Sequence, residues 1–242
     1  AHIAARDAAI GLIVGVRVRP VDGPDILVHP CDRPAYESLS ALLSEANMRG
    51  QKAAPRLYLA DLSRLPASTV FVMVPPVHPD AGYHVKLQQL SQLVMGRLWA
   101  GACLYRDGAD EARLALLATE AAALGLPLVA LSNALYHHPQ RRPLADVLCC
   151  IREKQRLDDA GYLLSRNAER HLLSPDEMAR RWRHYPDALK QTAVIADLCR
   201  FSLDDLSYEY PDELVPGGRT AIQELTYHTC LLYTSPSPRD TN

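Results

Sequence analysis

Short, strongly apolar runs mark strands in the first part of the chain. The run TVFVMV at 69–74 is apolar at almost every position and stops at Pro75, which is typical of a strand buried on both faces. The run PLVALS at 127–132 has the same character. The runs at 10–18 and 25–29 are separated by a turn sequence, PVDG, and we expect them to pair as a hairpin.

Two stretches with helical spacing lie between these runs. The first follows Asp32, an N-cap candidate, and stops at Gly50. The second starts at Asp110, which we expect to cap it, and ends at Gly125. Its expected core stripe consists of Leu114, Leu117, Ala121 and Leu124. Strands and helices that alternate with short links predict an α/β fold built on a mainly parallel sheet or barrel.

Only helical signals follow Pro143. The segment after it places four apolar residues on one helical face: Leu144, Val147, Leu148 and Ile151. SPDEM, from Ser174, has the sequence of a capping box, and helices are expected over 187–201 and 221–227. The sequence therefore predicts an α/β part at 1–143 and a helical part at 144–229.

The two ends of the sequence have an unusual character. CLLYTSPSPRD at 230–240 resembles the in-frame translation of a sequencing-library adapter. We therefore expect residues 230–242 to be a disordered artefact, with native sequence ending near Thr229. At the other end, AHIAARDAAIG lacks an initiator Met and has the character of the last turns of a helix.

Composition narrows the class of protein. The chain has 242 residues, is 48% hydrophobic and carries a formal net charge of −2, which suits one or two folded domains and gives no sign of a charge-driven partner. No apolar run reaches the roughly 18 to 20 residues of a membrane span, so we expect a cytoplasmic protein. The six cysteines contain no CxxC pair, so buried thiols are favoured over zinc or disulfides.

One stretch, LSNALYHHPQRRP at 131–143, has candidate chemistry. It follows a predicted strand, where α/β folds place their sites. However, Asn133 and Leu135 are poor metal ligands, and the adjacent His137 and His138 would point to opposite faces of an extended chain. A local turn with hydrogen-bonded side chains is the favoured interpretation.

Arginines supply the remaining candidate contacts. Arg141 and Arg142 could bind phosphate, because a guanidinium matches phosphate with two hydrogen bonds. Arg181 and Arg183 flank Trp182 in a small basic patch that could touch a DNA backbone. No GxGxxG, GxxxxGK[ST], HExxH or GxSxG motif occurs, so the usual cofactor and hydrolase signatures are absent.

Several longer motifs occur in one order. They are YHHPQRRPLADVL with CIRE after it, NAERHL followed by SPDEM, IADLCRFSLDDLSYEYPDELVP, and a final QELTY. In this order they resemble the bacterial C-family DNA polymerases, the polymerase III alpha type, and above all their error-prone relatives. The resemblance spans most of residues 10–227. It implies that 1–143 is the carboxyl-terminal portion of a distorted α/β barrel of the polymerase-and-histidinol-phosphatase (PHP) type, and that 144–229 leads to the polymerase palm.

The resemblance also identifies altered metal-ligand positions. Metal-bearing relatives have a glutamate in a GxE strand where this chain has Arg17. They have Asp-Val-His at a strand end where this chain has Asn133, Ala134 and Leu135. A cation repels a metal ion, and neither Asn nor Leu replaces an Asp or a His. We therefore expect a domain without metal and without catalytic residues.

The expected function is that of a piece of an error-prone, translesion DNA polymerase of the damage response. The intact enzyme would use DNA, deoxynucleotides and Mg²⁺ bound by palm carboxylates, with other translesion or replication proteins as partners, and this segment would be scaffold. A free-standing PHP-type metal-dependent phosphoesterase is the alternative enzyme; its candidate ligands are His29, His78, His84, His137 and His138. A non-enzymatic interaction module is the third possibility.

Overall fold

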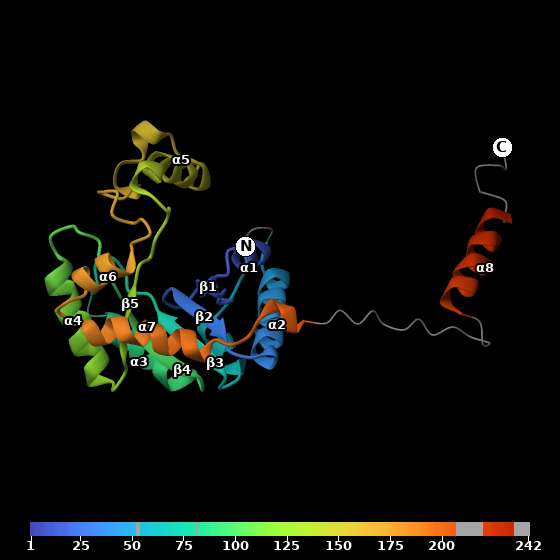
Figure 1. Ribbon diagram of the computed structural model, residues 1–242, viewed down its shortest axis with the longest axis horizontal. Helices are drawn as coiled ribbons and strands as arrows, with labels where there is room; N and C mark the ends of the chain where they lie inside the picture. The colour runs from blue at the N-terminus through green and yellow to red at the C-terminus, as the bar shows by residue number, and fades with distance from the viewer. Residues whose placement is uncertain (52–53, 81, 207–219, 235–242) are drawn as a thin grey trace. The chain divides into compact units, whose positions relative to one another are not determined.

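The computed structural model of the protein describes residues 1–51, 54–80, 82–206 and 220–234. Its contacts divide the chain into two compact units, residues 1–205 and the residues from 206 onward (Figure 1). Each unit is described by itself.

The first unit contains a five-stranded mixed sheet in the order β1-β2-β3-β4-β5. The strands are β1 Val16–Val18, β2 Ile26–Pro30, β3 Thr69–Met73, β4 Arg97–Cys103 and β5 Leu128–Leu131. β2 is antiparallel to both of its neighbours, whereas β3, β4 and β5 are parallel. The carboxyl ends of β1, β3, β4 and β5 therefore share one edge of the sheet with the amino end of β2. The expected mainly parallel sheet is mixed, because the first two strands do form the predicted hairpin.

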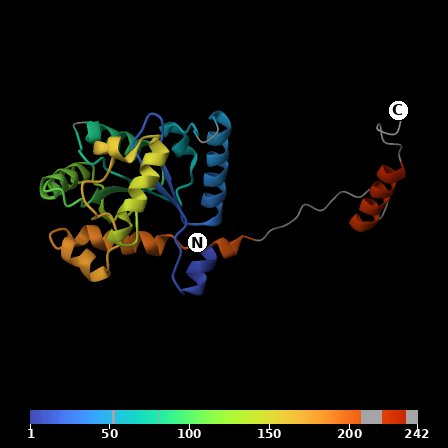
Figure 2. The ribbon, with the colours of Figure 1, turned by 90° about the horizontal axis from the view of Figure 1, so that it is seen from above.

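Helices cover the sheet and extend beyond it. They are α1 His2–Asp7, α2 Arg33–Arg49, α3 Gly82–Leu93, α4 Asp110–Ala123, α5 Arg142–Glu153, α6 Pro175–Arg181 and α7 Pro186–Leu198. Short 3-10 helices lie at Leu59–Arg64, Pro139–Arg141, Leu157–Asp159, Gly161–Leu163 and Leu203–Asp205. α7 (orange) runs along the sheet (Figure 1, Figure 2), and α5 (yellow) stands away from it in Figure 1.

The alternation of side chains along the central strand builds two cores. Phe71 and Met73 of β3 enter the larger core, which also holds apolar residues of α2, α3 and α4. Val70 and Val72 point to the other face, where they pack with Ile195 of α7. All five residues of β3 are buried. The prediction of a strand buried on both faces is therefore confirmed, and each face is covered by helices.

Local sequence signals explain the helix ends. The Asp32 carboxylate accepts a hydrogen bond from the Ala35 N–H at 2.9 Å, so the predicted N-cap of α2 is confirmed. Ser174 caps α6 in the same way, through the Glu177 N–H at 3.2 Å. Gly125 follows α4 with φ +66°, the left-handed conformation expected at a helix end.

Two elements escape the sequence pattern. β4 contains Gly101, where a Cβ atom would lie only 2.6 Å from the Met73 carbonyl oxygen. The close packing therefore requires glycine, which has a low strand propensity and weakens the strand signal in the sequence. α3 has a weak apolar pattern, although Leu87 and Leu90 are fully buried. α3 also carries His84.

The strand expected over 10–18 is shorter than predicted. Within residues 10–18, only Val16–Val18 (β1) pair with β2. Beside Gly15, the His29 imidazole hydrogen-bonds the Val14 carbonyl oxygen at 3.2 Å. This side-chain contact takes the place of further backbone pairing.

Residue 143 is not a boundary between compact units. Trp182, between α6 and α7, is 2% exposed and belongs to the larger core. The Trp99 indole N–H of β4 donates to the Gln191 side-chain oxygen of α7 at 2.8 Å. The change from strands to helices near residue 143 is present, but both parts belong to one compact unit that extends to residue 205, because α7 covers the second face of the sheet.

α5 differs from the other helices. Its apolar face, predicted from the sequence, forms, but Leu144, Val147, Leu148 and Ile151 are between 42% and 67% exposed. The face is therefore not part of either core of the first unit.

The second unit contains one described element, α8 Ala221–Thr234. The expected helix at 221–227 is present but longer. It continues through residues 230–234, which were expected to be disordered. Residues 207–219 and residues 235–242, the latter within the expected artefact, lie outside the described residues.

Replacement of Trp182 tests whether the sheet and the helices that follow residue 143 unfold together. Trp182→Ala should lower the free energy of unfolding by about 3–5 kcal/mol, because it removes a large buried side chain. The chain has two tryptophans, so Trp99 alone would report unfolding of the sheet in urea. Its midpoint should fall, whereas Met48→Ala, at a residue 86% exposed, should leave it unchanged. An unaltered Trp99 transition in Trp182→Ala would mean that the parts unfold separately.

Candidate functional site

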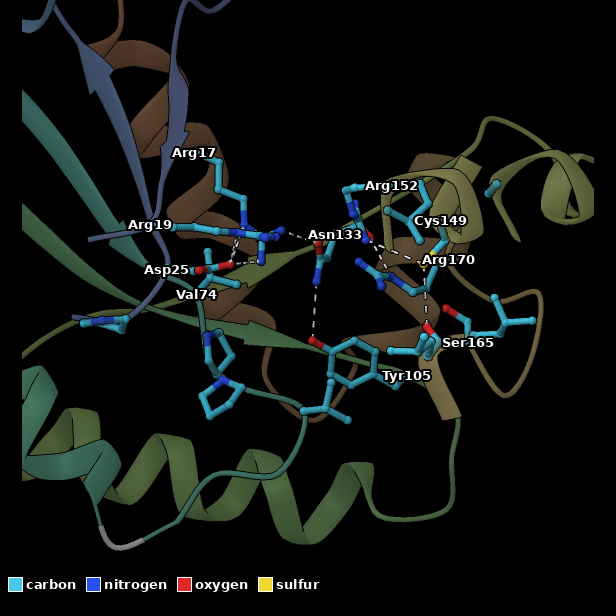
Figure 3. A pocket seen from close by; sticks show the side chains of 18 of the residues that line it. Arg17, Arg19, Asp25, Val74, Tyr105, Asn133, Cys149, Arg152, Ser165 and Arg170 are labelled. Atoms are coloured by element: carbon cyan, nitrogen blue, oxygen red, sulfur yellow. Dashed lines mark hydrogen bonds and ion pairs between the residues drawn. The ribbon is translucent and has the colours of Figure 1, made fainter. Parts of the chain in front are cut away.

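A cavity of about 650 Å³ lies at the edge of the sheet where the strand carboxyl ends meet (Figure 3). One wall comes from the sheet edge, and the opposite wall comes from α5 and the segment that follows it. The lining includes Arg17, Arg19, Asp25, Val74, Tyr105 and Asn133 from the first wall and Cys149, Arg152, Ser165 and Arg170 from the second.

Arg17 occupies the centre of the first wall. Its Nε and Nη2 donate to Asp25 Oδ2 at 2.9 and 2.5 Å. Arg19 also lies 3.3 Å from the same carboxylate oxygen. One carboxylate is therefore shared by two guanidinium groups, a geometry that favours charge-assisted hydrogen bonds.

Arg17, on the first outer strand of the sheet, also contacts a residue that follows the other outer strand. Its Nη1 donates to Asn133 Oδ1 at 3.2 Å (Figure 3). Arg17 belongs to β1 and Asn133 follows β5, which are the first and last strands of the sheet. In a flat sheet these strands would be about 19 Å apart, beyond the combined reach of the two side chains. The sheet must therefore curve so that its edges approach each other above the carboxyl ends.

Asn133 joins three parts of the site. Its backbone has φ +43°, a left-handed conformation that Asn adopts more readily than most residues. Its side-chain amide donates to Tyr105 Oη at 3.4 Å, and its carbonyl oxygen accepts from Arg170 Nε at 3.1 Å. Asn133 thus holds Arg17 and Arg170 on either side of itself.

The segment that carries α5 is closed at its base. The Leu135 N–H donates to the Arg170 carbonyl oxygen at 2.8 Å, and Tyr136 and His171 form a parallel bridge. Between these points the chain leaves the sheet, forms α5 and returns. This closure brings Arg170 to the pocket although it lies 37 residues from Asn133.

Burial suppresses ionisation of the acidic groups at the base of the pocket. It raises the pKa of the Cys103 thiol and raises the pKa of Tyr105 to about 12. The hydroxyl groups of Tyr83 and Tyr136 are buried without a hydrogen-bond partner among the described residues. At neutral pH these groups are uncharged, so they do not offset the arginine charges.

Arg113 supports the floor of the pocket from α4. Its side chain is 3% exposed and binds Asp107 and Asp110, each at 2.6 Å. Its Nε donates to the Val77 carbonyl oxygen at 2.7 Å, and its guanidinium lies 4.9 Å from the centre of the Tyr105 ring. Arg113 therefore connects the loops after β3 and β4.

Asp110 has a different role from the expected one. It is the first residue of α4 and not its cap, which is Ala109. Its two carboxylate oxygens accept from the N–H groups of Tyr105 and Arg106 at 2.9 and 2.8 Å. Asp110 thus fixes the turn after β4 that carries Tyr105 into the pocket.

The structure brings together the three positions expected to be altered metal ligands. Arg17 and Asn133 are hydrogen-bonded, and Leu135 lines the same cavity. A guanidinium, an amide and an isobutyl group do not fit a divalent metal ion, which needs carboxylate, imidazole or thiolate donors. Within 1–51, 54–80, 82–206 and 220–234, no three His, Cys, Asp or Glu side chains are arranged to hold a metal.

The histidines proposed as alternative ligands are dispersed. His29 lies near the other end of β2, paired with Val70, and burial lowers its pKa. His84 binds Glu120 at 2.5 Å from α3. His137 and His138 are exposed, and His138 accepts a bond from the Gln140 N–H at 3.3 Å. None of these four histidines lines the cavity, and neither does His78, the fifth candidate.

The arginines proposed to contact phosphate separate into two groups. Arg142 donates to the Ser165 carbonyl oxygen at 2.6 Å and lies 3.4 Å from Asp146. Arg181 is 10% exposed and binds both Glu169 and Glu177. These two have internal structural partners, whereas Arg141 and Arg183 are exposed.

Sequence reasoning missed most of the pocket. Asp25, Arg152 and Arg170 line it, yet none was a candidate residue. Arg170 lies in the NAERHL motif, but no local pattern indicates that this motif folds back onto Asn133. Only the three-dimensional closure of the α5 segment reveals the contact.

Curated proteins similar to this chain carry the name error-prone DNA polymerase. The chain is 44% identical over 216 residues to that of Rhodopseudomonas palustris (strain BisB5), a match over 88% of the chain and 20% of the relative. The Brucella abortus protein is 39% identical over 222 residues, with 91% and 21% covered. The Caulobacter vibrioides protein is 37% identical over 227 residues, with 93% and 21% covered.

The chain spans about a fifth of the length of these curated relatives. No family model matches it. No helix in the described part of the chain is long and apolar enough to cross a membrane.

Removal of Arg113 tests the floor of the pocket. Arg113→Ala should lower the free energy of unfolding by about 3–5 kcal/mol, because it leaves two carboxylates without their buried partner. The exposed Arg56 gives a matched control, and Arg56→Ala should change stability little. Chemical denaturation at pH 7 provides the measurement, and equal stabilities of the two variants would contradict this role.

The same variant should alter the pH dependence of stability. Burial alone would raise the pKa of Asp107, but hydrogen bonds from Arg113 and the Ala109 N–H hold it below its ordinary value. A lowered folded-state pKa stabilises the fold above the ordinary carboxyl pKa of about 4, and this contribution is lost as the pH falls further. Arg113→Ala should therefore show a smaller loss of stability below pH 4 than the parent chain. An unchanged acid limb would contradict the pairing.

Proposed function

Because this chain belongs to the error-prone group of the bacterial C-family DNA polymerases, we propose that it is a scaffold segment of such an enzyme. The intact protein would carry out DNA-directed nucleotidyl transfer during replication past damaged bases. The 44% identity to the Rhodopseudomonas palustris polymerase over nearly nine tenths of the chain carries this proposal. Its substrates, DNA and deoxynucleotides, and its cytoplasmic location are part of the same proposal.

Residues 1–143 of the first unit are proposed to be the later portion of a PHP-type domain. The curvature that lets Arg17 reach Asn133 supports this, because a distorted barrel needs its edge strands to approach each other. Residues from 144 onward would then lead toward the palm. The exposed apolar face of α5 supports this assignment. This chain spans only about a fifth of the length of its relatives, and in an enzyme of that length other segments would pack against the exposed face.

Within this segment we propose no catalytic residue and no metal ion. The donors at Arg17, Asn133 and Leu135 do not fit a divalent cation, and they lie where metal-bearing relatives have ligands. Mg²⁺ in the intact enzyme would be bound by carboxylates outside this chain. The dispersed histidines argue against a free-standing phosphoesterase.

Primer extension tests the scaffold proposal. The purified 242-residue chain, with a primer-template, deoxynucleotides and Mg²⁺, should give no detectable extension, because its described residues contain no carboxylate cluster for the metal ions. The full-length Rhodopseudomonas palustris relative serves as the positive control. Extension that persists through purification and tracks with the chain would refute the scaffold role. Stoichiometric bound zinc or manganese, with chelator-sensitive hydrolysis of a phosphate monoester, would favour the phosphoesterase instead.

The exposed arginines are proposed to contact the DNA backbone. Arg141 and Arg183 lie outside the internal ion pairs, so their charges are available to phosphates. Arg142 and Arg181 are proposed to act indirectly, by holding the backbone near these two residues.

Salt dependence tests this contact. Arg141→Gln and Arg183→Gln should each weaken binding of the chain to duplex DNA and reduce the slope of log K against log salt by about 1. Arg56→Gln should change neither quantity. Binding measured by fluorescence anisotropy from low to moderate salt gives both values. Identical slopes for the parent and both variants would remove these residues from the DNA surface.

A further inference from the structure

Two guanidinium groups converge on one neutral residue in the pocket, Asn133. Arg17 donates to the side-chain oxygen of Asn133, and Arg170 donates to its backbone oxygen. Like charges repel each other, and the uncharged Asn133 does not neutralise them. The convergence is therefore costly unless a further negative group is present.

The available carboxylates do not balance these charges. Arg17 shares Asp25 with Arg19, and Arg170 has no ion-pair partner in the part of the chain that the structure describes. The charged residues of the whole lining are the cations Arg17, Arg19, Lys86, Arg152 and Arg170 and the anions Asp25, Asp80 and Asp146. The excess is therefore two positive charges.

A buried thiol shows that the two guanidiniums act on the same place. Burial is the main influence on Cys103 and raises its pKa, but both Arg170 and Arg17 oppose that effect electrostatically.

Unused hydrogen-bonding groups lie in the same lining. Tyr83 is 2% exposed, and the buried hydroxyls of Tyr83 and Tyr136 have no hydrogen-bond partner in the described part of the chain. Both residues line the cavity. A buried polar group without a partner is unfavourable, and a ligand or its bound water would satisfy it.

We propose that this cavity binds a phosphate group between Arg17 and Arg170. A phosphate dianion matches the excess of two positive charges, and each guanidinium can bind its oxygens with two hydrogen bonds. The volume of about 650 Å³ lies in the range of small-molecule sites, so it accommodates free phosphate, pyrophosphate or a nucleoside monophosphate. This inference does not depend on the proposed polymerase role, since it rests on the pocket alone.

Calorimetry with the 242-residue chain tests the site in the presence of EDTA, which excludes metal-mediated binding. Titration with inorganic phosphate, pyrophosphate and deoxyadenosine monophosphate at constant ionic strength should show saturable binding to one site. Tighter binding of the nucleotide would identify a base-bearing ligand, and tighter binding of pyrophosphate would identify a free anion. Either result supports a phosphate site; no saturable binding of any of the three would overturn it.

Three substitutions locate the site. Arg17→Gln and Arg170→Gln should each weaken binding about tenfold, the equivalent of one lost interaction of about 1.4 kcal/mol. Arg56→Gln, which removes an exposed arginine outside the pocket, should bind like the parent chain. Equal affinities in all four proteins would place the phosphate elsewhere and overturn the proposal.

Asn133→Asp is expected to raise the stability of the protein, whereas the arginine variants weaken phosphate binding. It therefore tests the site even if the arginine variants do not fold. The new carboxylate would lie between Arg17 and Arg170 and take the place of the anion, and Asp tolerates a left-handed backbone nearly as well as Asn. This variant should be more stable than the parent chain in chloride, yet gain less thermal stability from added phosphate. A variant that is no more stable in chloride and gains as much from phosphate as the parent would contradict an anion site at Asn133.

Discussion

The hydrogen bond between Arg17 and Asn133 is the contact on which the rest of the site depends. It joins the first and the last strand of the sheet, so it requires the sheet to curve. Curvature encloses the space above the strand carboxyl ends, and the α5 segment closes it from the other side. The identities of these two residues also decide the chemistry of that space, because a guanidinium and an amide favour anions over metal cations.

Two further constraints hold this arrangement. The sheet is covered on both faces, by α2, α3 and α4 on one and by α7 on the other, so residues beyond 143 are needed to bury it. Arg113 then fixes the loops after β3 and β4 through two buried carboxylates and a carbonyl oxygen. The pocket is therefore positioned by a core that extends through both parts of the chain that the sequence pattern had separated.

The sequence allowed much of this fold to be predicted where a local pattern exists. The apolar run of β3, the cap of α2, and the helix that ends before Gly125 all lie close to the expected positions. β4 was missed because close packing requires Gly101, and α3 because its periodicity is weak. The convergence of Arg17, Asn133 and Arg170 has no local signature, since these residues come from three segments far apart in the chain. The resemblance to polymerases singled out Arg17, Asn133 and Leu135, but it did not reveal that two of them are bonded.

The central claim is that Arg17 and Asn133 form part of an anion site and not of a metal site. Crystals of the chain soaked with manganese and phosphate would test this directly through anomalous diffraction. The account predicts no manganese peak near Asn133 and phosphate density between Arg17 and Arg170. A manganese peak bonded to residues of this pocket, with no phosphate between the arginines, would contradict it.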